Sequence, residues 1–153
     1  MVNRKVAIVM GSQSDSETVK EATEILKQFN VPYAAKVLSA HRTPKEVEAF
    51  VTDAQRSGVK VFIAAAGGSA ALAGVIASHT TLPVIGIPME TSNLNGMDSL
   101  LSTVQMPAGI PVASMAIGKA GAKNAGLFAV AILSVSDAAL AEKLAEYRSA
   151  MRE

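Results

Sequence analysis

The chain has 153 residues, a usual size for one domain, and we expect a single domain over residues 1–153. Its 14 basic and 13 acidic residues give a net charge of +1, which argues against a nucleic-acid partner, because such partners require clustered Lys and Arg. The absence of Cys excludes disulfides, thiolate nucleophiles and Cys-bound zinc, and an aromatic content of 4% disfavours base-stacking and flat-cofactor sites.

Charged residues make up only 18% of the chain, against a usual share of about 25%. We therefore expect part of the surface to be buried against other copies in a homo-oligomer. Residues 61–89 carry no Asp, Glu, Lys or Arg, but glycines, His79 and Pro83 interrupt them, whereas a spanning helix needs about 20 mainly apolar residues in a row. We predict no membrane span, no signal peptide and a location in the cytoplasm.

The predicted elements alternate between buried strands and amphipathic helices. In chain order they are a strand at Lys5–Met10, a helix at Asp15–Asn30, a strand at Tyr33–Leu38, a helix at Pro44–Ser57, a strand at Lys60–Ala66, a helix at Ser69–Ser78, a strand at Pro83–Ile87, a helix at Met97–Val104, a strand at Pro111–Ile117, and helices at Gly121–Leu133 and Asp137–Arg152. This alternation predicts an α/β fold with a doubly wound parallel sheet, strand order 2-1-3-4-5, covered by helices on both faces.

The last helix carries one apolar stripe, formed by Leu140, Leu144, Tyr147 and Met151. Docking of this stripe onto the sheet is favoured over a contact between subunits. In doubly wound sheets, ligands bind beyond the carboxyl ends of the strands where the strand order reverses. Here that crevice lies between the first and third strands, walled by residues 11–15, 39–43 and 67–74.

The first wall, Gly11 to Asp15, has the layout of an anion site: a glycine after a strand, then hydroxyl side chains at a helix N-terminus. A structural interpretation competes with it, because Ser14 and Glu17 fit a helix capping box. The loop is not a P-loop, since no G-K-[ST] follows it.

The second wall contains Ser39, His41 and Arg42, followed by a predicted helix cap made by Thr43, Pro44 and Glu46. An Arg in this place can bind a phosphate with two parallel hydrogen bonds, and a His can transfer a proton near neutral pH. A structural His is equally compatible with the sequence.

In the third wall, Gly67 and Gly68 leave the backbone open to a ligand ring, although a tight turn would explain them as well. The segment from Leu94 to Pro107 could form a further wall or a subunit contact, and Asp98 within it could cap a helix. The other histidine, His79, follows a predicted helix end and is interpreted as structural.

Several of these segments together carry a family resemblance. They read GSQSD at 11–15, SAHRTP at 39–44, AGG at 66–68, NGMDSLLSTVQMPAGIPV at 95–112 and AIGKAGAKNAG at 116–126. From Val6 to about Leu133 the chain resembles the class I N5-carboxyaminoimidazole ribonucleotide mutases of purine biosynthesis. The resemblance implies a three-layer, flavodoxin-like α/β/α sandwich with a C-terminal helix, assembled as a homo-octamer.

The resemblance also implies an isomerase that moves a carboxyl group from the exocyclic nitrogen to ring carbon 4 of an aminoimidazole ribonucleotide, without metal or cofactor. His41 would be the general acid and base. The substrate would be bound by Ser12, Ser14, Asp15, Ser39, Arg42, Gly67 and Gly68. One departure stands out: Ala71 and Ala73 occupy positions where the family has His and Pro.

Rival functions differ in chemistry. An aminoimidazole ribonucleotide carboxylase using free CO2 is the nearest, and a divergent nucleotide-binding relative is a second. A nicotinate dinucleotide carboxylase would need a Cys, which the chain lacks. A receiver module needs an acidic cluster where Met10-Gly11 stands, and a flavin module needs aromatic residues that are scarce here.

Overall fold

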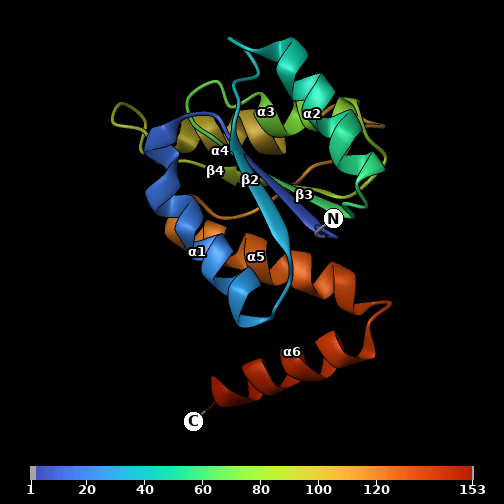
Figure 1. Ribbon diagram of the computed structural model, residues 1–153. Helices are drawn as coiled ribbons and strands as arrows, with labels where there is room; N and C mark the ends of the chain where they lie inside the picture. The colour runs from blue at the N-terminus through green and yellow to red at the C-terminus, as the bar shows by residue number, and fades with distance from the viewer. Residues whose placement is uncertain (1–2, 153) are drawn as a thin grey trace.

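A computed structural model describes residues 3–152 and contains a five-stranded parallel sheet flanked by helices (Figure 1). The elements are β1 (Val6–Met10), a 3-10 turn η1 (Gln13–Asp15), α1 (Ser16–Gln28), β2 (Tyr33–Val37), α2 (Pro44–Arg56), β3 (Val61–Ala66), α3 (Leu72–Ser78), β4 (Val84–Pro88), α4 (Met97–Val104), β5 (Ala113–Ser114), α5 (Lys119–Ser134) and α6 (Ala138–Ala150). The strand order β2-β1-β3-β4-β5 confirms the predicted topology.

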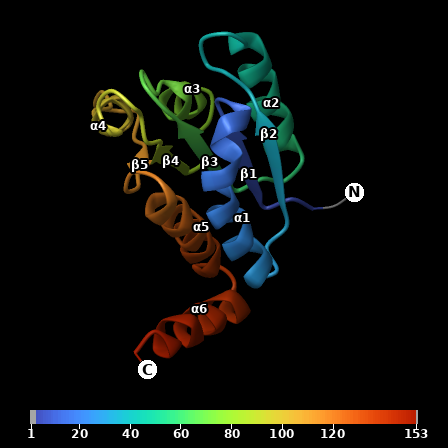
Figure 2. The ribbon, with the colours of Figure 1, turned by 90° about the vertical axis from the view of Figure 1, so that its left-hand side faces the viewer.

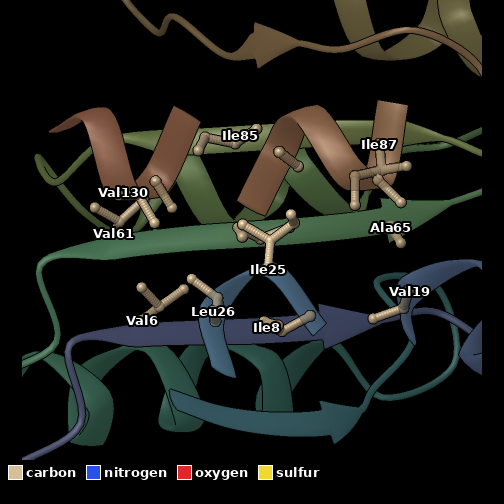
Figure 3. Packing of buried hydrophobic residues seen from close by; sticks show 14 of the residues in the cluster. Val6, Ile8, Val19, Ile25, Leu26, Val61, Ala65, Ile85, Ile87 and Val130 are labelled. Atoms are coloured by element: carbon tan, nitrogen blue, oxygen red, sulfur yellow. The ribbon is translucent and has the colours of Figure 1, made fainter. Parts of the chain in front are cut away.

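Two apolar cores lie on opposite faces of the sheet because side chains alternate along each strand. In β1, Val6 and Ile8 belong to the core shared with α1 and α5, whereas Ala7 and Val9 belong to the core shared with α2 and α3. Figure 2 shows these helix pairs on either side of the sheet, and Figure 3 shows the first core, where Ile25 and Leu26 of α1 lie near Ile8. Burying each such side chain stabilises the fold by roughly 1.5–3 kcal/mol.

The C-terminal helix α6 does not dock on the sheet, so that part of the sequence prediction is wrong. It lies outside the helix layer and packs against α5 (Figure 2). Leu140, Leu144 and Tyr147 are only partly buried, and the ring centroid of Tyr147 lies 5.7 Å from that of Phe29. Met151, the last residue of the predicted stripe, is 67% exposed. Most of α6 therefore remains uncovered in the single chain.

Several element boundaries differ from the prediction. The strand predicted at Pro111–Ile117 shortens to the two residues of β5, although the N–H groups of Met115 and Gly118 still donate to carbonyls of Gly86 and Pro88. The helix predicted from Ser69 begins at Leu72. The helix predicted from Gly121 begins one half-turn earlier, at Lys119.

Within residues 3–152, none of the helices combines the length and the apolar character that crossing a membrane requires. The same residues bring together no group of three or more His, Asp or Glu side chains that could hold a metal ion.

Candidate active site

The loops that follow β1, β2 and β3 meet at one cavity of about 360 Å³, at the carboxyl edge of the sheet. Because β1 lies between β2 and β3, the connections leave it in opposite directions and a crevice opens above it. The cavity is lined by Gly11, Ser12, Asp15, Ser39, Ala40, His41, Arg42, Ala66, Gly67, Ser69, Ala71 and Leu72. The expected crevice is therefore present, and all three predicted walls contribute to it.

The first loop is closed by a capping box between Ser12 and Asp15. The Ser12 N–H donates to Asp15 Oδ2 at 3.2 Å, and the Ser12 hydroxyl accepts from the Ser14 N–H at 3.3 Å. The predicted capping box of Ser14 and Glu17 is thus wrong, because η1 inserts a 3-10 turn before α1 and moves the cap two residues upstream. Ser14 Oγ lies 2.9 Å from Ser12 Oγ, so these two hydroxyls form one polar group.

The second loop is held at its base so that its tip projects into solvent. Thr43 Oγ1 accepts from the Ser39 N–H at 3.0 Å and donates to the Ser39 carbonyl at 3.1 Å. Ser39 Oγ accepts from the Arg42 N–H at 3.1 Å. Thr43 stands before Pro44 at the start of α2 as predicted, but its side chain makes no helix cap, since these bonds occupy it. The side chains of His41 and Arg42 are left exposed at the cavity.

The third loop is a glycine turn attached to α4. Gly68 has φ +69°, a conformation that favours glycine. A Cβ at Gly67 would lie 3.3 Å from Met89 Cβ, tighter than ordinary van der Waals contact. The Gly68 N–H donates to Ser99 Oγ at 3.0 Å, and the Ala70 N–H donates to Ser102 Oγ at 2.9 Å. At Gly67 the chain therefore presents only its backbone to the cavity.

The structure brings together most of the residues singled out from the sequence. Those that line the cavity are Ser12, Asp15, Ser39, His41, Arg42 and Gly67. Ser14 and Gly68 do not line it; Ser14 reaches it only through its contact with Ser12, and Gly68 faces α4. His79 lies elsewhere, exposed at the C-terminal end of α3. Asp98 is not a helix cap, because its Oδ1 accepts from Thr91 Oγ1 at 2.6 Å.

Among residues 3–152, Asp15 is the one carboxylate that lines the cavity. Burial raises the pKa of its side chain above the ordinary value of 3.8, and the hydrogen bond from the Ser12 N–H partly opposes that shift. A ligand whose hydroxyls donate hydrogen bonds to this carboxylate would stabilise its ionised form. Arg42 adds a cation and His41 an imidazole, and groups of these kinds can in general bind an anion or a diol and transfer a proton.

Sequence reasoning missed two contributors to this site. Ser99 is fully buried and Ser102 lies one helical turn further along α4, and together they hold the backbone of the third loop. The spacing of three between these serines puts both hydroxyls on one face of a helix, and this was the signal available in the sequence. Their partners lie 31 and 32 residues away, which no local pattern encodes.

The fold and the cavity define a class: a flavodoxin-like α/β protein with a small polar site at the switch point of its sheet. The profile of the AIR carboxylase family matches residues 5–153, and the chain belongs to this family.

Relatives named N5-carboxyaminoimidazole ribonucleotide mutase are close in sequence. The Bacillus subtilis protein is 59% identical over 143 residues, covering 94% of this chain and 88% of the relative. The Saccharolobus solfataricus protein is 53% identical over 148 residues, covering 97% and 92%. Among solved structures, Treponema denticola PurE superimposes with a TM-score of 0.89 at 29% identity, covering 97% of this chain and 92% of that one.

Proposed function

We propose that the protein is an isomerase of purine biosynthesis that converts N5-carboxyaminoimidazole ribonucleotide to 4-carboxy-5-aminoimidazole ribonucleotide. The observation that carries the proposal is the single cavity shared by His41, Arg42 and Asp15, in a chain 50–59% identical to mutases of this name.

The ribonucleotide would be bound by complementary groups on the first two loops. Arg42 would pair with the phosphate, assisted by hydroxyls of Ser12, Ser14 and Ser39, because a guanidinium and hydroxyl donors match phosphate oxygens. Asp15 would accept hydrogen bonds from the ribose hydroxyls. The base would lie against Gly67, where the absence of a side chain permits close approach to the backbone.

His41 would move one proton in each half of the reaction. In the first half, the bond between the exocyclic nitrogen and the carboxyl carbon breaks, its electron pair stays on nitrogen, and His41 delivers a proton there as CO2 forms. In the second half, ring carbon 4 attacks that CO2 and His41 removes the proton from carbon 4. Atoms, electrons and protons balance over the two steps, so the chemistry requires no further reactant.

The intermediate CO2 must stay beside the base, which requires a site closed to water. In the single chain, His41 and Arg42 are exposed at an open cavity. Assembly would supply cover. Apolar side chains project from the outer face of α4 and the loop before it, with exposed fractions of 58% at Leu94, 51% at Met97, 51% at Leu101 and 45% at Val104. We propose a homo-octamer in the cytoplasm, the assembly that the family resemblance implies.

A carboxylase that uses free CO2 and aminoimidazole ribonucleotide is the second candidate, favoured by the family's description, AIR carboxylase. The two reactions share their second half and differ in the source of CO2. The more similar relatives carry the mutase name, which places the mutase first.

The deciding experiment supplies the purified protein with N5-carboxyaminoimidazole ribonucleotide labelled in its carboxyl carbon, in the presence of excess unlabelled bicarbonate. A mutase transfers the label to carbon 4, and a carboxylase yields unlabelled product. A second reaction supplies aminoimidazole ribonucleotide and bicarbonate. If neither reaction forms product, both functions are contradicted, and the remaining candidate is a divergent nucleotide-binding relative.

A further inference from the structure

Successive residues of the segment 67–71, here called the glycine loop, face the cavity and the helix α4 in turn. Gly67, Ser69 and Ala71 line the cavity, whereas Gly68 and Ala70 do not. Those two intervening residues donate their N–H groups to α4, at 3.0 Å to Ser99 Oγ and 2.9 Å to Ser102 Oγ. Each peptide group that turns away from the cavity is therefore held by a serine of one helix.

The hydroxyl of Ser102 has three carbonyls within hydrogen-bond distance, one of them in the glycine loop. Its single hydroxyl proton lies within reach of the Gly68 carbonyl at 3.1 Å and the Asp98 carbonyl at 2.7 Å. Ser99 is completely buried, so no water competes for its bond to Gly68. Among the residues that the structure describes, the N–H groups of Gly67 and Ser69 donate to no protein acceptor and remain free for a ligand.

A loop with two successive glycines has more conformational freedom to lose than other segments, so it needs external bonds to stay in one shape. The helix that supplies these bonds is itself fixed. Thr103 of α4 is buried against β4 of the sheet, with 3% of its surface exposed. Asp98 accepts a hydrogen bond from Thr91 in the loop after β4. The helix α4 thus fixes the glycine loop at the place where a ligand would contact the loop.

We propose that Ser99 and Ser102 are positioning residues, which orient the free N–H groups of Gly67 and Ser69 toward the base and its carboxyl group. The identity of that ligand rests on the proposed function. Neither serine touches the cavity, so both act through the loop. Because misplacement by about 1 Å can cost a hundredfold in rate, losing either bond is expected to lower kcat at least tenfold.

The first measurement tests the bonds alone, by amide hydrogen exchange on the full chain without ligand. Ser99→Ala is expected to speed exchange at Gly68, and Ser102→Ala at Ala70, at least tenfold each. Thr103→Val is the matched control, because it removes a buried α4 hydroxyl that bonds only the Ser99 carbonyl within the helix. Unchanged exchange at Gly68 and Ala70, or equal acceleration in the control, would overturn the proposal whatever the activity.

The second measurement tests positioning by comparing the Kd of aminoimidazole ribonucleotide with that of ribose 5-phosphate. Both ligands would use the first two loops, but only the first places a base against the glycine loop. In the alanine variants, the Kd of the ribonucleotide is expected to rise about tenfold and the Kd of ribose 5-phosphate less than twofold. Ser102→Thr keeps a hydroxyl at this position and is expected to restore the wild-type ratio of the two Kd values. A ratio unchanged in the alanine variants would refute positioning, whereas wild-type protein that binds neither ligand would instead refute the proposed function.

Discussion

Replacing His41 by Asn is expected to abolish turnover while leaving the fold intact. The side chain of His41 is exposed at the tip of the second loop, and among the described residues its ring forms no hydrogen bond. Exposed substitutions without such partners change the free energy of unfolding by less than about 0.5 kcal/mol. For a chain of this length, that corresponds to a melting-temperature change of about 1–2 °C.

The loss in rate is expected to be far larger than the loss in stability. Removing a general acid or base costs about 10²–10⁴-fold, and at about 1.36 kcal/mol per tenfold this equals roughly 2.7–5.4 kcal/mol of transition-state stabilisation. His41 serves both half-reactions in the proposed mechanism, so the upper end of that range applies.

The assay pairs single-turnover conversion of the carbamate ribonucleotide with thermal unfolding and light scattering on the same samples. His79→Asn is the matched control, because His79 is also exposed but lies outside the cavity. A kcat within threefold of wild type in His41→Asn would remove this residue from the mechanism, and so would equal losses in both variants.

Three further predictions concern binding and assembly. Arg42→Ala and Asp15→Ala are expected to raise the Kd of aminoimidazole ribonucleotide at least tenfold by calorimetry; unchanged affinity in both would place the ligand elsewhere. Because burial raises the pKa of Asp15, ligand affinity should fall as pH drops through that raised pKa, and Asp15→Asn should lose this part of the pH dependence. Light scattering is expected to show a high-order oligomer, and Leu101→Lys on the exposed face of α4 should weaken it; a wild-type monomer at micromolar concentration would contradict this.

The sheet and its cavity were predictable because they follow from patterns that are local in the sequence. Continuous apolar runs such as Val6–Met10 are typical of strands buried on both faces, and alternation with helices determines a parallel order. The strand order then predicts that Ser12, His41 and Gly67 lie at one edge of the sheet, and this prediction requires no information on long-range contacts.

The errors have a different physical cause at each of the three places where they occur. Ser14 and Glu17 satisfy a capping pattern, yet Ser12 and Asp15 form the cap because an extra 3-10 turn precedes α1. The helix expected from Ser69 is delayed because α4 binds the Gly68 and Ala70 N–H groups. For α6, the apolar stripe gave the correct inner face, but the sequence held no information on which surface that face would meet.

Ala71 lines the cavity, at a position where the sequence resemblance leads us to expect His. The proposed mechanism assigns both proton transfers to His41 and the binding of phosphate and ribose to the first two loops. A ring at position 71 would then add contact with the base but no step of the chemistry. The backbone can accept it, since Ala71 has ordinary helical angles of φ −76° and ψ −12° at the start of α3.

Ala71→His is therefore expected to lower the Kd of aminoimidazole ribonucleotide by about threefold to tenfold, the gain of one good contact of roughly 1 kcal/mol. The single-turnover rate should change less than threefold. Ala71→Phe is the matched control, because it supplies a ring without a titratable nitrogen and should tighten binding similarly if contact is the cause. Conversion of the carbamate ribonucleotide by Ala71→His but not by wild type would contradict this prediction. A ring at position 71 would then be required for the reaction, and this chain would act on another substrate.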